Sequence, residues 1–151
     1  WQEAMRPYDF IVDRDRSSIE WRYFNSPGHY QLTIVRQIVS GAVGPIRGYI
    51  VDRVLMEETT NTLVVADFLF LPKHELGFVV ALRYLMQRTR DLSLFKVLAW
   101  CPRVHLAFGL FKALGFRTTG MIPVISYRDA LFDQIETCQA AHFTIGDSDN
   151  V

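Results

Sequence analysis

The 151-residue sequence has no net formal charge, few cysteines and no long apolar run. Sixteen lysines and arginines balance sixteen aspartates and glutamates, which argues against a general nucleic-acid-binding surface. A transmembrane helix needs about 18 consecutive apolar residues. No run of that length occurs, and the start does not resemble a signal peptide. We therefore expect a cytoplasmic protein whose partners include neither membranes nor nucleic acids.

The two cysteines, Cys101 and Cys138, lie far apart and lack the CxxC spacing of metal and redox sites. Reduced thiols are the favoured interpretation over a disulfide. His29 and His142 show no metal-ligand spacing either. No metal is therefore expected.

Apolar and aromatic side chains are plentiful, at 50% and 13% of the sequence, so a substantial core is expected. The length and the absence of a linker predict one domain over residues 1–151, with its core at about 8–145. Because the first residue is Trp1 rather than methionine, we expect this domain to be part of a longer chain. Seven basic residues accompany only one acidic residue between Leu76 and Arg117. This excess suits an anionic ligand, although arginines on two outer helix faces would produce it too.

The hydrophobic pattern predicts an antiparallel meander followed by a helix, a strand, a helix and a final strand or pair. The expected strands are 8–12, 30–39, 46–56, 62–71, 94–100, 116–129 and 142–150, and the expected helices are 17–24, 75–92 and 103–114. The two strands joined by the long helix should be parallel. The expected fold class is therefore α/β in the α+β sense, with a mixed, mostly antiparallel sheet and helices on both faces.

The side chains that should face the core follow from helical spacing. Trp21 and Phe24 lie three residues apart and are expected to pack into the sheet. Val104, Phe108 and Phe111 form the predicted inward stripe of the last helix. Its end is predicted at Gly115, a residue suited to the left-handed conformation that stops a helix.

The element order and the segment FGLFKALGFRTTG, residues 108–120, resemble the GNAT acyltransferase superfamily over about residues 30–125. The resemblance implies a V-shaped opening between two central parallel strands. It also implies transfer of an acetyl or other acyl group from acyl-CoA to a primary amine. The segments VDRDRSSIEWRYFNSP and FTIGDSD are similar to the C-terminal half of bacterial proteins with two GNAT-like or Fem-like modules. A second GNAT-like domain or a homodimer is therefore a possible partner, and the acceptor is expected to be a small-molecule or peptide amine.

The resemblance also assigns the cofactor-binding positions. The family holds the pyrophosphate of coenzyme A at the start of the long helix, where backbone amides and the helix N-terminus favour anions. In the matching stretch only Gly77 fits the family motif, and Glu75 places a carboxylate where the anion should lie. The strand before the helix is expected to hold the thioester and pantetheine. The implied cofactor-binding residues are Phe68, Leu69, Phe70, Leu71, His74, Gly77, Phe78 and Val79.

Asp67 occupies the position of an acidic residue that family members often carry, and it is the expected base for the attacking amine. The alternative is a structural carboxylate bound to backbone N–H groups or to an arginine. The family's acid, a tyrosine four residues before the helix-ending glycine, is replaced by Phe111. Tyr84 and Tyr127 are the other tyrosines expected in the neighbourhood of the site.

Two further interpretations concern Cys101 and Arg22. Cys101 could pair with His105 as a nucleophile, although a buried, inert thiol is more common. Arg22 could meet a carboxylate of the acceptor or form an ordinary surface ion pair. The sequence thus leaves three functions open: an acyltransferase, a non-catalytic module of the same fold, and an unrelated α/β ligand-binding or interaction domain.

Overall fold

The computed structural model describes residues 2–8, 10–11, 14–56, 60–120, 141–142 and 144. The elements in chain order are α1 (Gln2–Met5), β1 (Phe10–Ile11), α2 (Arg16–Ile19), the π-helix η1 (Glu20–Phe24), β2 (Tyr30–Val39), β3 (Ala42–Met56), β4 (Asn61–Phe70), α3 (Glu75–Asp91), β5 (Lys96–Ala99), α4 (Phe108–Ala113) and β6 (Ala141–His142). None of these helices is long and apolar enough to cross a membrane.

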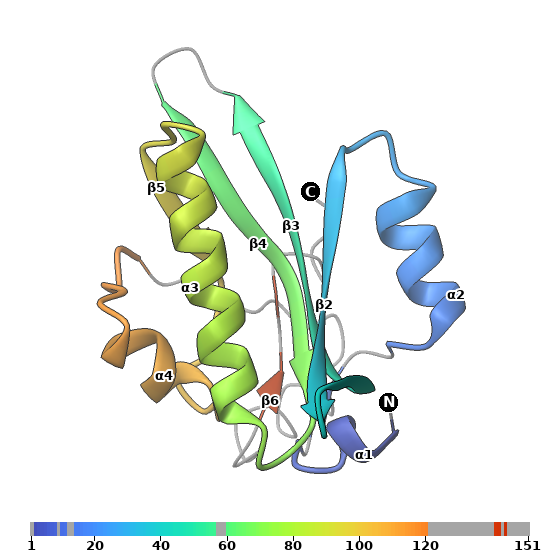
Figure 1. The fold of residues 1–151 in the computed structure, drawn as a ribbon. Helices are drawn as coiled ribbons and strands as arrows, with labels where there is room; N and C mark the ends of the chain where they lie inside the picture. The colour runs from blue at the N-terminus through green and yellow to red at the C-terminus, as the bar shows by residue number, and fades with distance from the viewer. Residues whose placement is uncertain are drawn as a thin grey trace, which may run out of the picture.

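The main sheet has the strand order β2-β3-β4-β5 (Figure 1). β2, β3 and β4 form an antiparallel meander, and β4 pairs with β5 in parallel. The helix α3 joins these two parallel strands. The predicted meander and parallel crossover are therefore confirmed. A second, two-stranded sheet joins β1 and β6 in parallel, so segments from near the two ends of the chain lie side by side.

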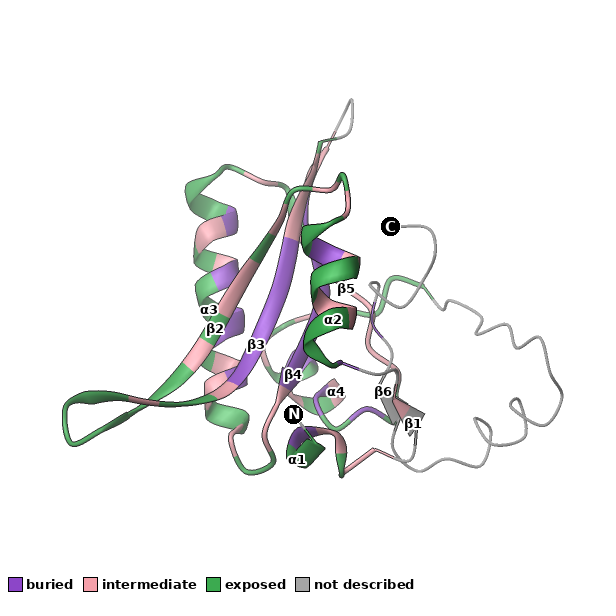
Figure 2. Cartoon of the chain, turned by 90° about the vertical axis from the view of Figure 1, so that its right-hand side faces the viewer, coloured by how far each residue is buried: buried purple, intermediate pink, exposed green. Residues whose placement is uncertain are grey.

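Helices cover both faces of the sheet, and each face buries its own apolar cluster (Figure 2). α3 and α4 pack on one face, where Phe68, Phe78 and Phe111 form a group of ring contacts. On the other face Tyr23 of η1 packs against strands β3 and β4. β4 is buried along almost its whole length, as its nearly continuous apolar sequence predicts.

Gly115 ends α4 as predicted. Its φ is +91°, in the region that glycine adopts at little cost. The amide of Phe116 donates to the carbonyl of Phe111 at 3.1 Å, and the amide of Gly115 donates to Lys112 at 3.0 Å. These bonds satisfy carbonyls that the end of a helix would otherwise leave without partners.

The last predicted helix is shorter than its pattern suggests. Residues 103–107 form turns, and the helix itself begins at Phe108. The inward stripe is accordingly incomplete: Phe111 is buried and Phe108 half-buried, while Val104 is exposed. The strand predicted from Phe116 is absent over residues 116–120, and its remainder lies outside the described residues.

The prediction for Trp21 and Phe24 is wrong. Trp21 is 68% exposed and Phe24 is also exposed, whereas Tyr23 is buried between them. The cause is the π-helical winding of η1, in which the amide of Asn25 bonds to the carbonyl of Glu20 five residues back. Because 3.6-residue spacing does not apply to such a turn, a different aromatic side chain faces the sheet.

Candidate functional site

The two parallel strands separate halfway along β4. Their pairing runs from Thr62 opposite Lys96 to Val65 opposite Ala99, where β5 ends. β4 continues to Phe70 and, within the described part of the chain, keeps a strand neighbour only on its β3 side. The predicted opening between the central parallel strands is therefore present.

A β-bulge marks the same point in β4. Val51 lies opposite Asp67 but Asp52 lies opposite Val65, so Ala66 is the additional residue. Val65 before the bulge and Phe68 after it both lie in the cluster on the α3 side. The alternation of side chains thus shifts by one residue, as bulges commonly cause. As a result the Asp67 carboxylate reaches the hydroxyl of Tyr49, which packs in the opposite cluster.

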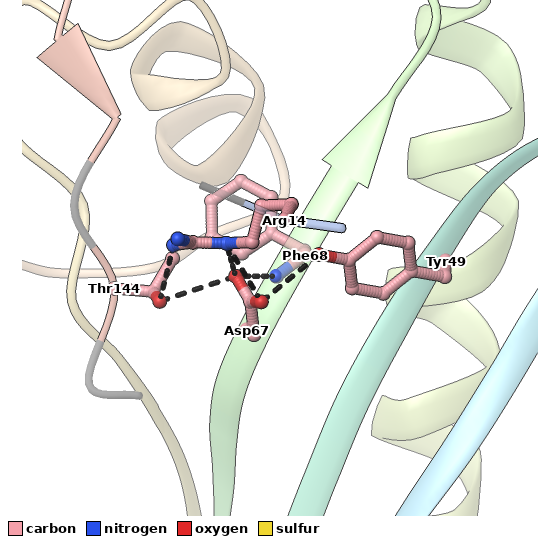
Figure 3. Close-up of polar contacts among 5 residues, drawn as sticks. All are labelled: Arg14, Tyr49, Asp67, Phe68 and Thr144. Carbon is pink, nitrogen blue, oxygen red and sulfur yellow. Dashed lines mark hydrogen bonds and ion pairs between the residues drawn. The ribbon is translucent and has the colours of Figure 1, made fainter. Parts of the chain in front are cut away.

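The carboxylate of Asp67 is fully buried, and Figure 3 shows four of its partners among the described residues. Arg14 Nε lies 2.9 Å from Oδ2, and the Tyr49 hydroxyl donates to the same oxygen at 2.9 Å. The amide of Phe68 donates to Oδ1 at 2.9 Å. The Thr144 hydroxyl also donates to Oδ1, at 3.2 Å. An ionised carboxylate can remain buried here because a cation and three neutral donors replace its water.

These partners come from distant parts of the chain. Arg14 lies between β1 and α2, Tyr49 is on β3, and Thr144 follows β6. Arg14 and Thr144 are as completely buried as the carboxylate that they contact. The arrangement matches the structural alternative for Asp67. For Asp67 to act as a base, an amine or water would have to replace one of these donors, and this role stays a prediction.

Tyr49 serves as a donor in this network. Burial, and then the negative charge of Asp67, raise the pKa of the Tyr49 hydroxyl well above its usual value. The hydroxyl therefore remains protonated at neutral pH and can hold its bond to the carboxylate.

A histidine and a thiol lie beside the opening. The buried ring of His105 is 5.1 Å from the rings of both Phe68 and Tyr8, and its Nδ1 accepts a bond from the amide of Ala107 at 2.8 Å. Burial raises the pKa of the Cys101 thiol to about 12. The pKa of Tyr8 is also raised to about 12, by burial and then by the nearby Cys101. A thiol that stays protonated is a poor nucleophile, so this geometry favours the inert interpretation of Cys101.

The predicted pyrophosphate-binding residues lie at the start of α3, with His74 directly before the helix and Gly77, Phe78 and Val79 within it. His74 precedes the helix without capping it through its side chain. The amides of Gly77 and Phe78 bond to the carbonyl of His74 at 2.9 and 3.4 Å. The side chain of Phe78 is buried in the core and Val79 is half-buried. A ligand here would therefore meet main-chain groups of Phe78 rather than its side chain.

Two charged residues near the start of α3 also affect an anion. Glu75 Oε1 accepts a bond from the amide of Lys73 at 3.2 Å, so the carboxylate occupies a donor that a phosphate could use. Lys73 has φ +66° and is exposed. It brings a positive charge to the segment before α3.

Two main-chain donors of the predicted thioester strand are already engaged. The amide of Phe68 bonds to Asp67, and that of Leu71 bonds to the carbonyl of Arg47 at 2.9 Å. Leu69 is fully buried on the face opposite α3, whereas Phe70 is half-buried against Phe78. Binding of a polar chain along this strand would depend chiefly on its carbonyl groups.

The remaining predicted positions divide into buried and surface residues. Phe111 is buried against Phe68, Phe78 and Phe116 at ring distances of 5.0–5.6 Å. Tyr84 is exposed on α3, and Tyr127 lies outside the described residues. Arg22 is half-buried on η1, across the sheet from α3 (Figure 2).

Sequence reasoning missed Arg14, Tyr49 and Thr144. The signal was indirect: a lone aspartate in an apolar strand requires a cation or several donors. The sequence did not indicate which arginine would supply the charge, because Arg14 stands in a polar segment typical of the surface. Among the described residues, no group of three or more histidine, cysteine or acidic side chains is arranged to hold a metal ion.

Comparison with known proteins identifies the fold. No protein-family model matches the chain, and no curated protein matches it. Among solved structures, an aminoglycoside antibiotic 6'-N-acetyltransferase, AAC(6')-IG from Acinetobacter haemolyticus, is similar with a TM-score of 0.52 and 14% identity, covering 85% of this chain and 90% of that one. The fold is GNAT-like.

Two other bacterial structures are similar to this GNAT-like chain. A tetramutant of the BH1408 protein from Bacillus halodurans has a TM-score of 0.56 at 11% identity, over 78% of this chain and 79% of that one. A variant of TTHA1254 from Thermus thermophilus has a TM-score of 0.52 at 15% identity, over 76% and 81%. At such low identity the shared property is the fold.

Proposed function

We propose that this GNAT-like chain is an acyl-CoA-dependent N-acyltransferase, in which a primary amine attacks the thioester directly. The observation that carries this proposal is the opening between β4 and β5 after Val65 and Ala99, next to the start of α3. One edge of β4 there has no neighbouring strand in the described residues. An extended amide-containing chain such as pantetheine can use such an edge.

We assign the pyrophosphate to the start of α3. Main-chain groups at Gly77, Phe78 and Val79 would meet it, with His74 beside them. The positive end of the α3 dipole favours an anion, although the amides of Gly77 and Phe78 also bond to the carbonyl of His74. Lys73 adds a positive charge, whereas Glu75 opposes binding. Phe68, Leu69, Phe70 and Leu71 would line the thioester and pantetheine. Arg22 is the proposed contact to a carboxylate of the acceptor.

Asp67 is the proposed base, on the condition that a ligand displaces one of its donors. A proton from the amine would then pass to the carboxylate directly or through a water. Because Phe111 is buried and has no hydroxyl, the departing thiolate would take its proton from solvent.

A non-catalytic role in docking or acceptor binding is the second candidate. Two observations favour it: the carboxylate of Asp67 is occupied by four donors, and the position of the family's acid is a buried phenylalanine. In that case the opening would hold a ligand without transferring an acyl group.

Thermal unfolding with increasing acetyl-CoA tests the proposal first. A ligand that binds only the folded state raises stability by about 2.7 kcal/mol at 100 times its Kd. We expect a saturable rise in Tm with acetyl-CoA and none with ATP at the same concentration. Release of free thiol in the presence of primary amines then distinguishes the enzyme from the docking module. No rise at millimolar acetyl-CoA would contradict both acyl-CoA binding and catalysis.

Asp67→Asn separates a base from a structural carboxylate. If Asp67 is the base, this variant loses turnover while acetyl-CoA binding stays close to that of the unsubstituted protein. Tyr49→Phe is the matched control, because it removes one bond to Asp67 but keeps the carboxylate. Equal losses of binding and turnover in both variants would assign Asp67 to the structural network alone.

A further inference from the structure

The outer edge of β2 has no partner in the part of the chain that the structure describes. Among the described strands, β2 is the outermost of the main sheet and pairs only with β3. The side-chain bonds near it stay within the hairpin, from Arg36 to the carbonyl of Gly44 and from Arg47 to Gln37. Figure 2 faces this edge, and no helix crosses in front of β2. Every second residue of such an edge presents its N–H and C=O groups outward.

This edge lacks most of the features that keep edge strands from pairing. Arg36 is the only charged residue in β2, which has neither proline nor glycine. Bulges flank Arg36, but the run from Tyr30 to Val35 has regular register with β3. Proteins usually protect an exposed edge with charges, prolines or bulges. The regular run has none of these.

Three of the six exposed side chains of β2 are apolar. Ile34 is 46% exposed, Ile38 is 64% exposed and Val39 is 48% exposed. Val43, opposite Ile38 on β3, is also exposed. Burying these side chains would add hydrophobic stabilisation to the main-chain bonds of a new strand pair.

We propose that the β2 edge pairs antiparallel with β2 of a second copy of this chain, so that the two sheets become continuous across a two-fold axis. A two-fold axis places the same strand against itself. For axes at any residue from Leu32 to Val35, Arg36 falls opposite an uncharged residue, namely Gly28, Tyr30, Leu32 or Ile34. The formal net charge of the chain is zero, so two copies do not repel each other at long range.

Sedimentation of the 151-residue chain from micromolar to submillimolar concentration tests the proposal. We expect a reversible monomer–dimer equilibrium. Ile34→Lys should weaken the dimer roughly tenfold or more, because it places like charges near the axis and removes apolar contact. Val80→Lys is the matched control, since Val80 is an exposed apolar residue on α3. Monomers at every concentration, or equal weakening by both variants, would overturn the proposal.

Hydrogen exchange on the unsubstituted protein gives a second readout that does not depend on the folding of a variant. Outward-facing amides between Gln31 and Val35 should exchange more slowly as the dimer forms, whereas amides on α3 should not change. A dimer without added protection in β2 would place the interface elsewhere. Protection that appears only when a different protein is added would assign the edge to that partner and also overturn the proposal. Neither measurement uses acyl-CoA, so its outcome is separate from that of the acyltransferase test.

Discussion

The two halves of β4 differ in how they are held. From Thr62 to Val65 the strand lies between β3 and β5 and buries mainly aliphatic side chains. From Ala66 to Phe70 its only strand neighbour among the described residues is β3, and it carries a fully buried carboxylate. The bulge at Ala66 separates the halves. A single additional residue thus changes a mainly apolar strand into one that can accommodate a charged group.

The difference determines which changes each half tolerates. Apolar contacts in the first half are non-directional, so similar side chains can replace one another at modest cost. The contacts of Asp67 in the second half are directional, and the loss of one removes a donor from a buried charged oxygen. We therefore expect the largest single effects on stability near Asp67.

Arg14→Met gives the largest expected effect. It leaves the Asp67 carboxylate buried without its cation, and breaking a buried pair in this way costs about 3–5 kcal/mol. Denaturation with urea should show a fall of that size in the free energy of unfolding. Arg16→Met is the control, because the ion pair of Arg16 with Glu20 is exposed and should contribute little to stability.

A double variant shows whether the cost comes from the unpaired charge. Arg14→Met combined with Asp67→Leu removes both partners, and the loss should be smaller than that of Arg14→Met alone. If Arg14→Met alone lowers the free energy of unfolding by less than about 1 kcal/mol, the ion pair of Asp67 contributes little, and the contrast between the two halves of β4 fails.

The sequence predicted the first half better than the second. The apolar run of β4 and the periodicity of α3 identified the sheet and the helix, because burial on repeating positions leaves a clear pattern. The requirement for a partner of Asp67 could also be predicted. Arg14 could not be identified, because its pairing depends on chain segments more than fifty residues apart. The exposure of Trp21 was missed for a local reason, since π-helical turns leave no periodic signal.

Asp52, a carboxylate beside the first half of β4, should differ from Asp67: replacing it should raise the stability of the protein. Asp52 lies opposite Val65 and is fully buried, with one bond from Arg88. Burial raises the pKa of Asp52 above its usual 3.8 despite the attraction of Arg88. Folding therefore favours the protonated form of this group relative to the unfolded chain.

Asp52→Asn should stabilise the protein at neutral pH. Because the folded pKa is raised, the group stabilises the fold only while it is protonated, and that contribution is lost as the pH rises from 3.8 through the folded pKa. The advantage of the variant should thus be greatest at neutral pH and absent below pH 3.8. Urea denaturation across this pH range measures it. Asp91→Asn, at an exposed carboxylate on α3, controls for the change in net charge, and equal behaviour of the two variants would contradict the prediction.

Gly77→Ala, in the first turn of α3 after the second half of β4, has the smallest expected effect on stability. An added Cβ would lie 3.3 Å from Val35 Cγ1 and 3.8 Å from Phe70. The helix preference of alanine, up to about 1 kcal/mol, opposes that tight contact, so the free energy of unfolding should change by less than about 1 kcal/mol. Acetyl-CoA affinity should fall, because the methyl group keeps the pyrophosphate from the backbone. Gly109→Ala on α4, where a Cβ meets open space, should leave affinity unchanged. If Gly77→Ala binds acetyl-CoA as tightly as the unsubstituted protein, the pyrophosphate does not bind at the start of α3.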